Sequence, residues 1–181
     1  MNVPILLIAT LLTASLLTPA AATGQTEVSE ADSSYTESLT PDSQSLHSAL
    51  AQEILLLTNT QRVHHGLAPL IPEPNLAKAA TDHSREMRSL NYFSHTSPVS
   101  GRATPRLRVN KYGLNPRMVA ENIYECSGYQ IEQTARSAVD AFMQSPGHRE
   151  NILSSRSTHI GIGFVEVNGT VSVTQVFAGG L

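Results

Sequence analysis

Three side chains in this sequence could bind a metal ion together and activate water: His95, Glu121 and His148. Two neutral imidazoles and one carboxylate form a common three-ligand set for zinc, which leaves the fourth position open to water. Water bound there can ionise near neutral pH and act as a nucleophile. The His-Glu-x-x-His spacing of metalloprotease helices does not occur in the sequence. The three groups are far apart along the chain, so only the fold can bring them together.

Ser145 offers a second chemistry, because a serine hydroxyl close to His148 could act as a nucleophile with the histidine as its base. The same residues, Ser145-Pro146-Gly147-His148, are also typical of a helix end that orients the histidine. We favour this second interpretation. His83 lies on the apolar stripe of a predicted helix, so we expect a core histidine with one hydrogen bond rather than a fourth ligand.

The elements that must position these residues follow from hydrophobic periodicity and from turn residues. We expect helices over 46–64, 75–90 and 105–112, an extended segment over 119–124, helices over 131–143 and 148–153, and strands over 159–167 and 170–177. The two last strands alternate and are joined by Asn168-Gly169, which is a strong signal for a two-residue hairpin turn. Helices flanking a small antiparallel sheet give an α+β fold.

Several short motifs occur in a characteristic order along the domain. They are Asn59-x-x-Arg62, Gly66-Leu67-x-Pro69-Leu70, Tyr92-Phe93-Ser94-His95, Glu121-Asn122-Ile123, Ser145-Pro146-Gly147-His148-Arg149-x-Asn151-Ile152-Leu153 and Ile160-Gly161-Ile162-Gly163. This ordered set resembles the CAP superfamily, also called SCP-like extracellular domains, and is most similar to its short, disulfide-poor bacterial branch. The resemblance covers about residues 46–177. It implies a three-layer α-β-α sandwich with a central cleft.

The resemblance also implies which residues line that cleft. The two family histidines correspond to His95 and His148, and the glutamate of the Glu-Asn-Ile motif corresponds to Glu121. In several members this cleft binds a divalent metal such as zinc. Many members carry a further glutamate three positions after a tryptophan. Here Phe142 stands at the tryptophan position and Ser145 at the glutamate position, which argues against a mechanism that needs paired carboxylates.

Four polar residues of the motifs are expected to support the site rather than to contact a ligand. Asn122 and Asn151 are predicted to hold backbone groups of the cleft together. Asn59 and Arg62 are predicted to fix the first helix to the loop that precedes the second.

The first 45 residues differ in character from the rest. An apolar run over 5–17, too short to span a membrane, is followed by Ala20-Ala21-Ala22, so residues 1–22 are predicted to be a secretory signal peptide cut after Ala22. Residues 23–45 are rich in Ser, Thr and acids and contain no Lys or Arg, so we predict a disordered linker. The CAP-like domain would then occupy residues 46–181. We expect a secreted protein, extracellular or periplasmic, with no transmembrane segment after cleavage.

Charge and cysteine content narrow the class of protein. The 181-residue chain has a net charge of −3, which excludes a nucleic-acid binder that relies on a broad basic field. A single cysteine, Cys126, excludes an internal disulfide framework; it is either a small buried hydrophobe or an exposed thiol. Five bases cluster between the second helix and the Glu-Asn-Ile motif: Arg102, Arg106, Arg108, Lys111 and Arg117. They form a solvated basic face or bind an anionic wall polymer or lipid headgroup.

Three functions remain open from the sequence. The first is an extracellular binding or interaction module, expected as a monomer, whose partner is a lipid, an envelope glycan or a protein and whose cleft binds a divalent metal. The second is a zinc-dependent hydrolase of a peptide or envelope substrate, in which Glu121 is a ligand or the general base. The third is a structural domain with an inert cleft.

Overall fold

The computed structural model describes residues 41–128 and 131–181, with the side chains of 48–128 and 133–181. The predicted signal peptide, 1–22, lies outside the described residues. Helix α1 begins at Pro41, so the predicted linker over 23–45 ends earlier than expected and its last five residues are helical. The remainder of that linker lies outside the described residues.

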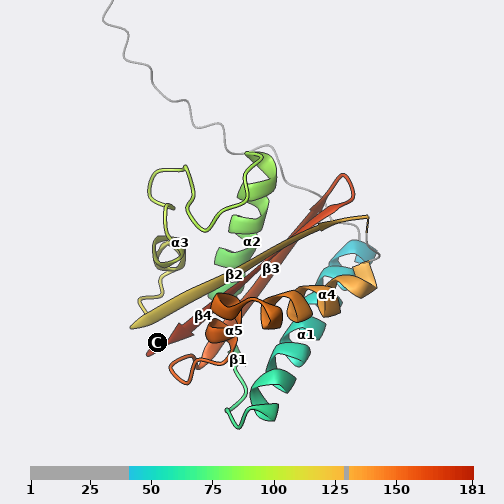
Figure 1. The fold of residues 1–181 in the computed structure, drawn as a ribbon. Coiled ribbons are helices and arrows are strands. Elements are labelled where there is room, and N and C mark those ends of the chain that lie inside the picture. The colour runs from blue at the N-terminus through green and yellow to red at the C-terminus, as the bar shows by residue number, and fades with distance from the viewer. Residues whose placement is uncertain (1–40, 129–130) are drawn as a thin grey trace, which may run out of the picture. The chain divides into compact units, whose positions relative to one another are not determined.

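Five helices and four strands make up the described part of the chain (Figure 1). Their bounds are α1 Pro41–His64, β1 Ile71–Pro72, α2 Pro74–Ser89, α3 Pro105–Lys111, β2 Met118–Ser127, α4 Ile131–Gln144, α5 Pro146–Ile152, β3 His159–Val167 and β4 Thr170–Gly179. Strand β2 is longer than the segment expected over 119–124, because it pairs with β4 along its whole length.

The strands form one sheet in the order β1-β3-β4-β2, so β2 is an edge strand. Strands β2 and β3 both run antiparallel to β4, whereas the short β1 runs parallel to β3. The sheet is therefore mixed, which adds one short parallel pair to the antiparallel sheet that we predicted. The β3–β4 turn has positive φ at Asn168 (53°) and Gly169 (73°), as a type I′ hairpin turn requires.

The sheet lies between two helical layers, which confirms the predicted α+β sandwich. Helices α2 and α3 lie on one side of it, and α1, α4 and α5 lie on the other (Figure 1). Helix α2 packs closely on β3 at two glycines. A Cβ atom on Gly161 would lie 2.1 Å from the carbonyl carbon of Leu76, and one on Gly163 would lie 2.1 Å from the amide nitrogen of Thr81. The Gly-x-Gly pattern in β3 thus permits this approach.

Apolar cores fill both sides of the sheet. Val176 of β4 packs with α2 and α3, whereas the next residue, Phe177, packs with α4 and α5. Cys126 is buried with α1 and α4 and forms no disulfide, which selects the first of the two roles proposed for it. Successive residues of a strand point to opposite faces. Because Glu121 pairs with Val176, its side chain faces α2 and α3, and that of Asn122 faces α4 and α5.

Candidate histidine site

The fold brings His95, Glu121 and His148 together at edge strand β2. His95 lies in the loop after α2, and its Nδ1 is 2.9 Å from Oε1 of Glu121. His148 lies in α5, in the opposite helical layer, and its ring centroid is 6.2 Å from that of His95 in an edge-to-face arrangement. The His95 side chain is 47% exposed, so this histidine site opens to solvent.

Glu121 supports the site from behind. Its side chain is only 1% exposed, and one terminal nitrogen of Arg108 donates to both carboxylate oxygens, at 2.9 and 2.7 Å. Nδ1 of His95 donates to the same carboxylate when Glu121 is ionised. Among the residues that the structure describes, no three His, Cys, Asp or Glu side chains are arranged to hold a metal ion. The predicted three-ligand set does not fit this geometry, because Glu121 is engaged by Arg108 and His95.

Arg108 is not part of the solvated basic face that the sequence predicted. This residue is 3% exposed, and its guanidinium also donates to the backbone oxygens of Arg102 at 2.8 Å and His95 at 3.1 Å. The arginine therefore fixes both the carboxylate and the loop that carries His95. The sequence held no signal that separated it from the other bases of the run, since the direction of its side chain depends on how α3 packs.

His83 is fully buried, as expected of a core histidine, and its Nε2 lies 3.1 Å from the backbone oxygen of Ser94. The same nitrogen is 3.6 Å from Oε1 of Glu121, so His83 packs directly behind the site. Burial is the main reason that the pKa of His83 is lowered, and the nearby Glu121 carboxylate opposes this effect. Its Nδ1 has no hydrogen-bond partner within the described residues.

The loop that carries His95 is fixed to α2 by a buried carboxylate. Tyr92 donates its hydroxyl hydrogen to Glu86 at 2.5 Å, and the hydroxyl of Ser97 donates to the same oxygen. Burial and the hydrogen bond to Glu86 raise the pKa of Tyr92 to about 12, so Tyr92 remains a donor at neutral pH. Bonds on both sides of His95 in the sequence restrict where its ring can lie.

His148 has a different environment from His95. The ring of Phe142 packs edge-on against it with centroids 5.3 Å apart, at the position where the family resemblance places tryptophan. Burial, and to a smaller extent the nearby His95, lowers the pKa of His148. The imidazole is therefore neutral at neutral pH and keeps a nitrogen lone pair for a ligand.

Ser145 is half-buried at the N-cap of α5, and its hydroxyl forms no capping bond. No hydrogen bond joins it to His148 within residues 41–128 and 131–181, so the geometry provides no serine–histidine pair.

Two asparagines join α5 to β2. Nδ2 of Asn151 donates to the backbone oxygen of Glu121 at 3.2 Å and to Oδ1 of Asn122 at 2.9 Å. Nδ2 of Asn122 donates in turn to the backbone oxygen of His148 at 3.2 Å. These bonds hold the two backbone segments that present Glu121 and His148 at a fixed separation.

Asn59 and Arg62 act at the far end of α1. Asn59 exchanges two hydrogen bonds with the backbone of Leu70, at 3.1 and 2.8 Å. Arg62 is 2% exposed, and its guanidinium donates to four backbone oxygens, those of Ala68, Ile152, Ser154 and Ser157. Together they fix α1 to the loop before α2 and to the segment after α5.

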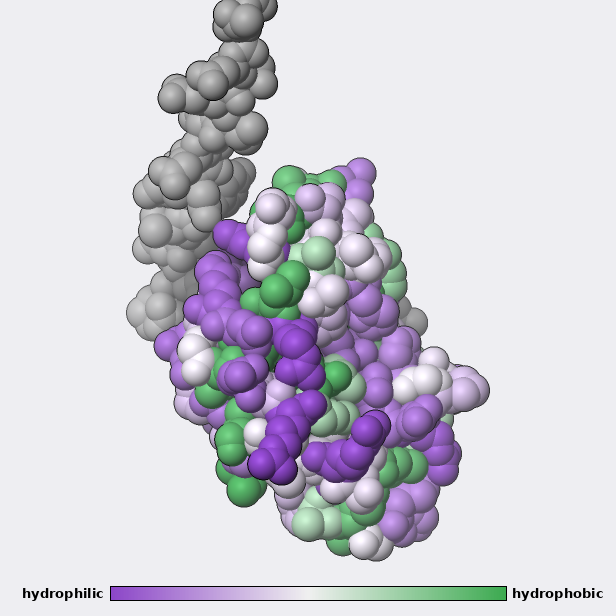
Figure 2. All heavy atoms as spheres, turned by 90° about the vertical axis from the view of Figure 1, so that its left-hand side faces the viewer, coloured by the Kyte–Doolittle hydropathy of each residue, from purple (hydrophilic) through white to green (hydrophobic). Residues whose placement is uncertain are grey.

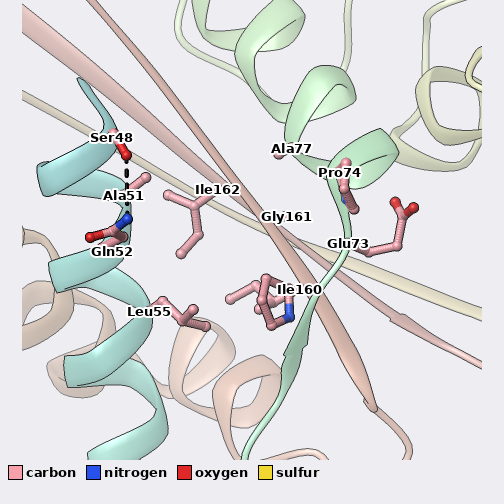
Figure 3. Close-up of a pocket in the computed structure, with 11 residues that line it drawn as sticks. Ser48, Ala51, Gln52, Leu55, Glu73, Pro74, Ala77, Ile160, Gly161 and Ile162 are labelled. Atoms are coloured by element: carbon pink, nitrogen blue, oxygen red, sulfur yellow. Dashed lines mark hydrogen bonds between the residues drawn. The ribbon is translucent and has the colours of Figure 1, made fainter. Parts of the chain in front are cut away.

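A hollow of about 400 Å³ lies between α1, α2 and β3, away from the histidine site (Figure 3). Its lining is mostly apolar, and Glu73 is the one charged residue that lines it. The carboxylate of Glu73 accepts from the backbone nitrogen of Leu76 at 2.6 Å and so caps α2. The lining therefore provides no set of groups for catalysis.

The sequence model of the family described as CAP, the cysteine-rich secretory protein family, matches residues 55–177. The chain belongs to the CAP family. YkwD of Bacillus subtilis is 38% identical over 132 residues, which cover 73% of this chain and 48% of YkwD. This CAP chain therefore spans about half the length of that relative.

Solved structures share the fold. An extracellular protein from Bacillus anthracis that contains an SCP domain is 31% identical with a TM-score of 0.65, over 78% of this chain and 44% of that one. An outer surface protein from Borrelia burgdorferi is 21% identical with a TM-score of 0.60, over 77% and 96% of the two chains, and this likeness shows the fold alone. In the described part of this CAP chain, no helix is long and apolar enough to cross a membrane.

Proposed function

We propose that this CAP domain is a secreted interaction module whose histidine site binds a divalent cation such as zinc through His95 and His148. The observation that carries the proposal is the pair of rings from opposite layers, with centroids 6.2 Å apart. Glu121 engages Nδ1 of His95 and leaves Nε2 to face a ligand. A carboxylate behind a metal-binding histidine fixes the ring orientation and raises its basicity.

Two protein ligands leave the remaining coordination positions of a cation to water or to a partner molecule. Once bound, the cation would attract a carboxylate, carbonyl or phosphate oxygen of that partner. His148 is suited to this role because its lowered pKa keeps the ring neutral. The role is one of binding, and the partner class remains a lipid, an envelope glycan or a protein.

Within the described residues, Glu121 is not placed to act as the general base that the hydrolase alternative requires. A base must reach the proton that it removes, and its pKa must suit proton transfer. Both oxygens of Glu121 accept from Arg108 in a buried ion pair, and Ser145 stands where the family resemblance places a second carboxylate. The geometry therefore favours a binding module over a hydrolase.

Secretion is supported by two observations. The apolar run over 5–17 followed by Ala20-Ala21-Ala22 is typical of a cleaved signal peptide. The relative from Bacillus anthracis is described as extracellular. Export can be tested by expressing the full chain with a C-terminal tag and locating the tag inside or outside the cells; retention of the uncut chain in the cytoplasm contradicts secretion.

Metal binding can be tested by titrating zinc into the full chain in a calorimeter, with His95→Ala and His148→Ala as variants. We expect binding at micromolar zinc and at least a tenfold loss of affinity in each variant. His64→Ala is the matched control, because His64 is exposed at the end of α1. Absence of heat at micromolar zinc, or an equal loss in the control, contradicts the metal site. Zinc-dependent turnover of peptide, ester or glycan libraries would support the hydrolase instead.

A further inference from the structure

Charge is divided between the two sides of the sheet. Residues 74–117, which form α2, α3 and their connecting loop, contain eight Lys and Arg but only two acids. Residues 41–73 and 118–181, which form all the other elements, contain four bases and nine acids. The formal charges of these segments are therefore +6 and −5. Glu121 and Glu125 of β2 form ion pairs with Arg108 and Arg88, so the α2–α3 side as a whole carries +4 when these two acids are counted with it. The nearly balanced charge of the whole chain conceals this concentration of bases in one stretch of the sequence.

Arg108 is buried, whereas the other seven bases are exposed or, like Arg88 and Arg102, partly exposed. They are Lys78, Arg85, Arg88, Arg102, Arg106, Lys111 and Arg117, which we call the α2–α3 basic face. Four of the seven form ion pairs with acids: Arg85 and Lys111 with Asp82, Arg102 with Glu86, and Arg88 with Glu125 of β2. Glu86 is 6% exposed, and Asp82 accepts from Arg85, Lys111 and Tyr112.

Three of these bases have no acidic partner among the described residues. The guanidinium of Arg106 donates to the backbone oxygens of Pro116 and Arg117, at 2.6 and 3.2 Å. Lys78 donates to the amide oxygen of Asn75 at 3.2 Å, and Arg117 is exposed. Their positive charges remain available to a ligand from outside the chain.

The shape of this side favours an extended ligand. Hydrophilic side chains are spread across the side of the molecule where α2 and α3 lie (Figure 2). The surface there includes a shallow hollow of about 430 Å³, lined by residues that include Lys78, Arg85 and Asp82. The Asp82 carboxylate is neutralised by ion pairs with Arg85 and Lys111. A polymer chain can enter such a hollow, whereas a flat bilayer surface cannot.

The types of base indicate phosphate. Five of the seven are arginines, whose planar guanidinium matches a phosphate group with two parallel hydrogen bonds. We propose that the α2–α3 basic face binds an extended polymer of phosphate groups. The contact is electrostatic and local, so the affinity for the polymer must fall steeply as the salt concentration rises.

The test uses the full chain and inorganic polyphosphate, with binding followed by fluorescence anisotropy at several salt concentrations. A chelator is present throughout, so that failure of the proposed metal site does not affect the result. The variant Lys78→Gln/Arg85→Gln/Arg117→Gln removes three exposed bases of the face. We expect at least a tenfold loss of affinity at low salt. The slope of log affinity against log salt should become shallower by roughly two, as for three lost phosphate contacts on a single-stranded chain.

The matched control is Arg136→Gln/Arg149→Gln/Arg156→Gln, which removes three exposed bases from the opposite side and changes the net charge equally. We expect it to bind polyphosphate within twofold of the unmodified chain, and circular dichroism should show both variants folded. Equal losses in the two variants, or no binding at low salt, would overturn the proposal. So would tighter binding, per phosphate, to phosphatidylglycerol vesicles than to polyphosphate, because that result indicates a membrane surface.

Discussion

One nitrogen of Arg108 donates to both carboxylate oxygens of Glu121, and both side chains are at least 96% buried. This pair lies directly behind His95, whose Nδ1 binds the same carboxylate. A buried ion pair must compensate for the loss of hydration of two charges, and it does so only with good geometry and further hydrogen bonds. Here the extra bonds reach the backbone of the loop that presents His95, so the stability of the pair and the position of the ring are linked.

Removing Arg108 should therefore strongly destabilise the fold. Arg108→Met leaves the Glu121 carboxylate buried without its counter-charge, and we expect a loss of about 3–5 kcal/mol in the free energy of unfolding. Urea denaturation followed by circular dichroism measures this loss. Arg106→Met is the control. Arg106 lies two residues before Arg108 in α3, but it is exposed and forms no ion pair with the described residues. A change below about 1 kcal/mol for Arg108→Met would show that the pair is not important for stability.

Stability should fall in mild acid because of His83. Its pKa is lowered in the folded state, mainly by burial, from an unfolded value of 6.5. The unfolded chain therefore binds the proton more readily than the folded chain. The contribution of neutral His83 to stability is fully present above about pH 6.5 and is lost as the pH falls through the folded pKa. Each unit of pKa difference corresponds to about 1.4 kcal/mol.

The measurement compares urea unfolding of the unmodified chain and His83→Gln from pH 7.5 to pH 5. We expect a smaller loss of stability in His83→Gln over this range. His148→Gln serves as the second arm, because the pKa of His148 is lowered as well. The same pH dependence in the unmodified chain and in His83→Gln contradicts the assignment to His83.

Gly163→Ala should disturb the contact between α2 and β3. The added Cβ would lie 2.1 Å from the amide nitrogen of Thr81, which is helix backbone and cannot move alone. We expect a loss of about 1–3 kcal/mol, or more if α2 shifts as a whole. Gly147→Ala is the control, since its Cβ would meet no atom within 4 Å and its φ is not positive. The Gly147→Ala variant should be neutral or stabilised by up to about 1 kcal/mol. Thermal melting of the two variants and the unmodified chain measures both effects.

Asn151→Ala should weaken both the fold and the proposed metal site. The variant removes the bonds from α5 to the backbone of Glu121 and to Asn122, which we expect to cost about 1–3 kcal/mol in stability. Zinc affinity should also fall, because His148 is carried by the same helix. Asn115→Ala, at an exposed loop position, is the control for both readouts. Unchanged zinc affinity in a folded Asn151→Ala chain would show that the bonds of Asn151 are not needed to position His148 for metal binding.

The sequence by itself determined the family and the general architecture of this protein. Periodic apolar residues predicted the helices, and Asn168-Gly169 predicted the hairpin, because these signals act within a few residues of each other. The ordered motifs identified the CAP fold and the residues that meet at β2. The Gly-x-Gly pattern of β3 was part of that recognition, although its reason, the close approach of α2, is visible only in the structure.

Only the tertiary structure decided how the charged groups are used. Arg106 and Arg108 stand two residues apart in one run of bases, yet one is exposed and the other is buried against Glu121. A charge pattern along the chain does not tell which side chain a short helix turns inward, because that depends on the packing of α3 against a strand that follows later in the sequence. For the same physical reason, only the fold showed which bases of residues 74–117 pair with acids and that the Glu121 carboxylate holds Nδ1 of His95.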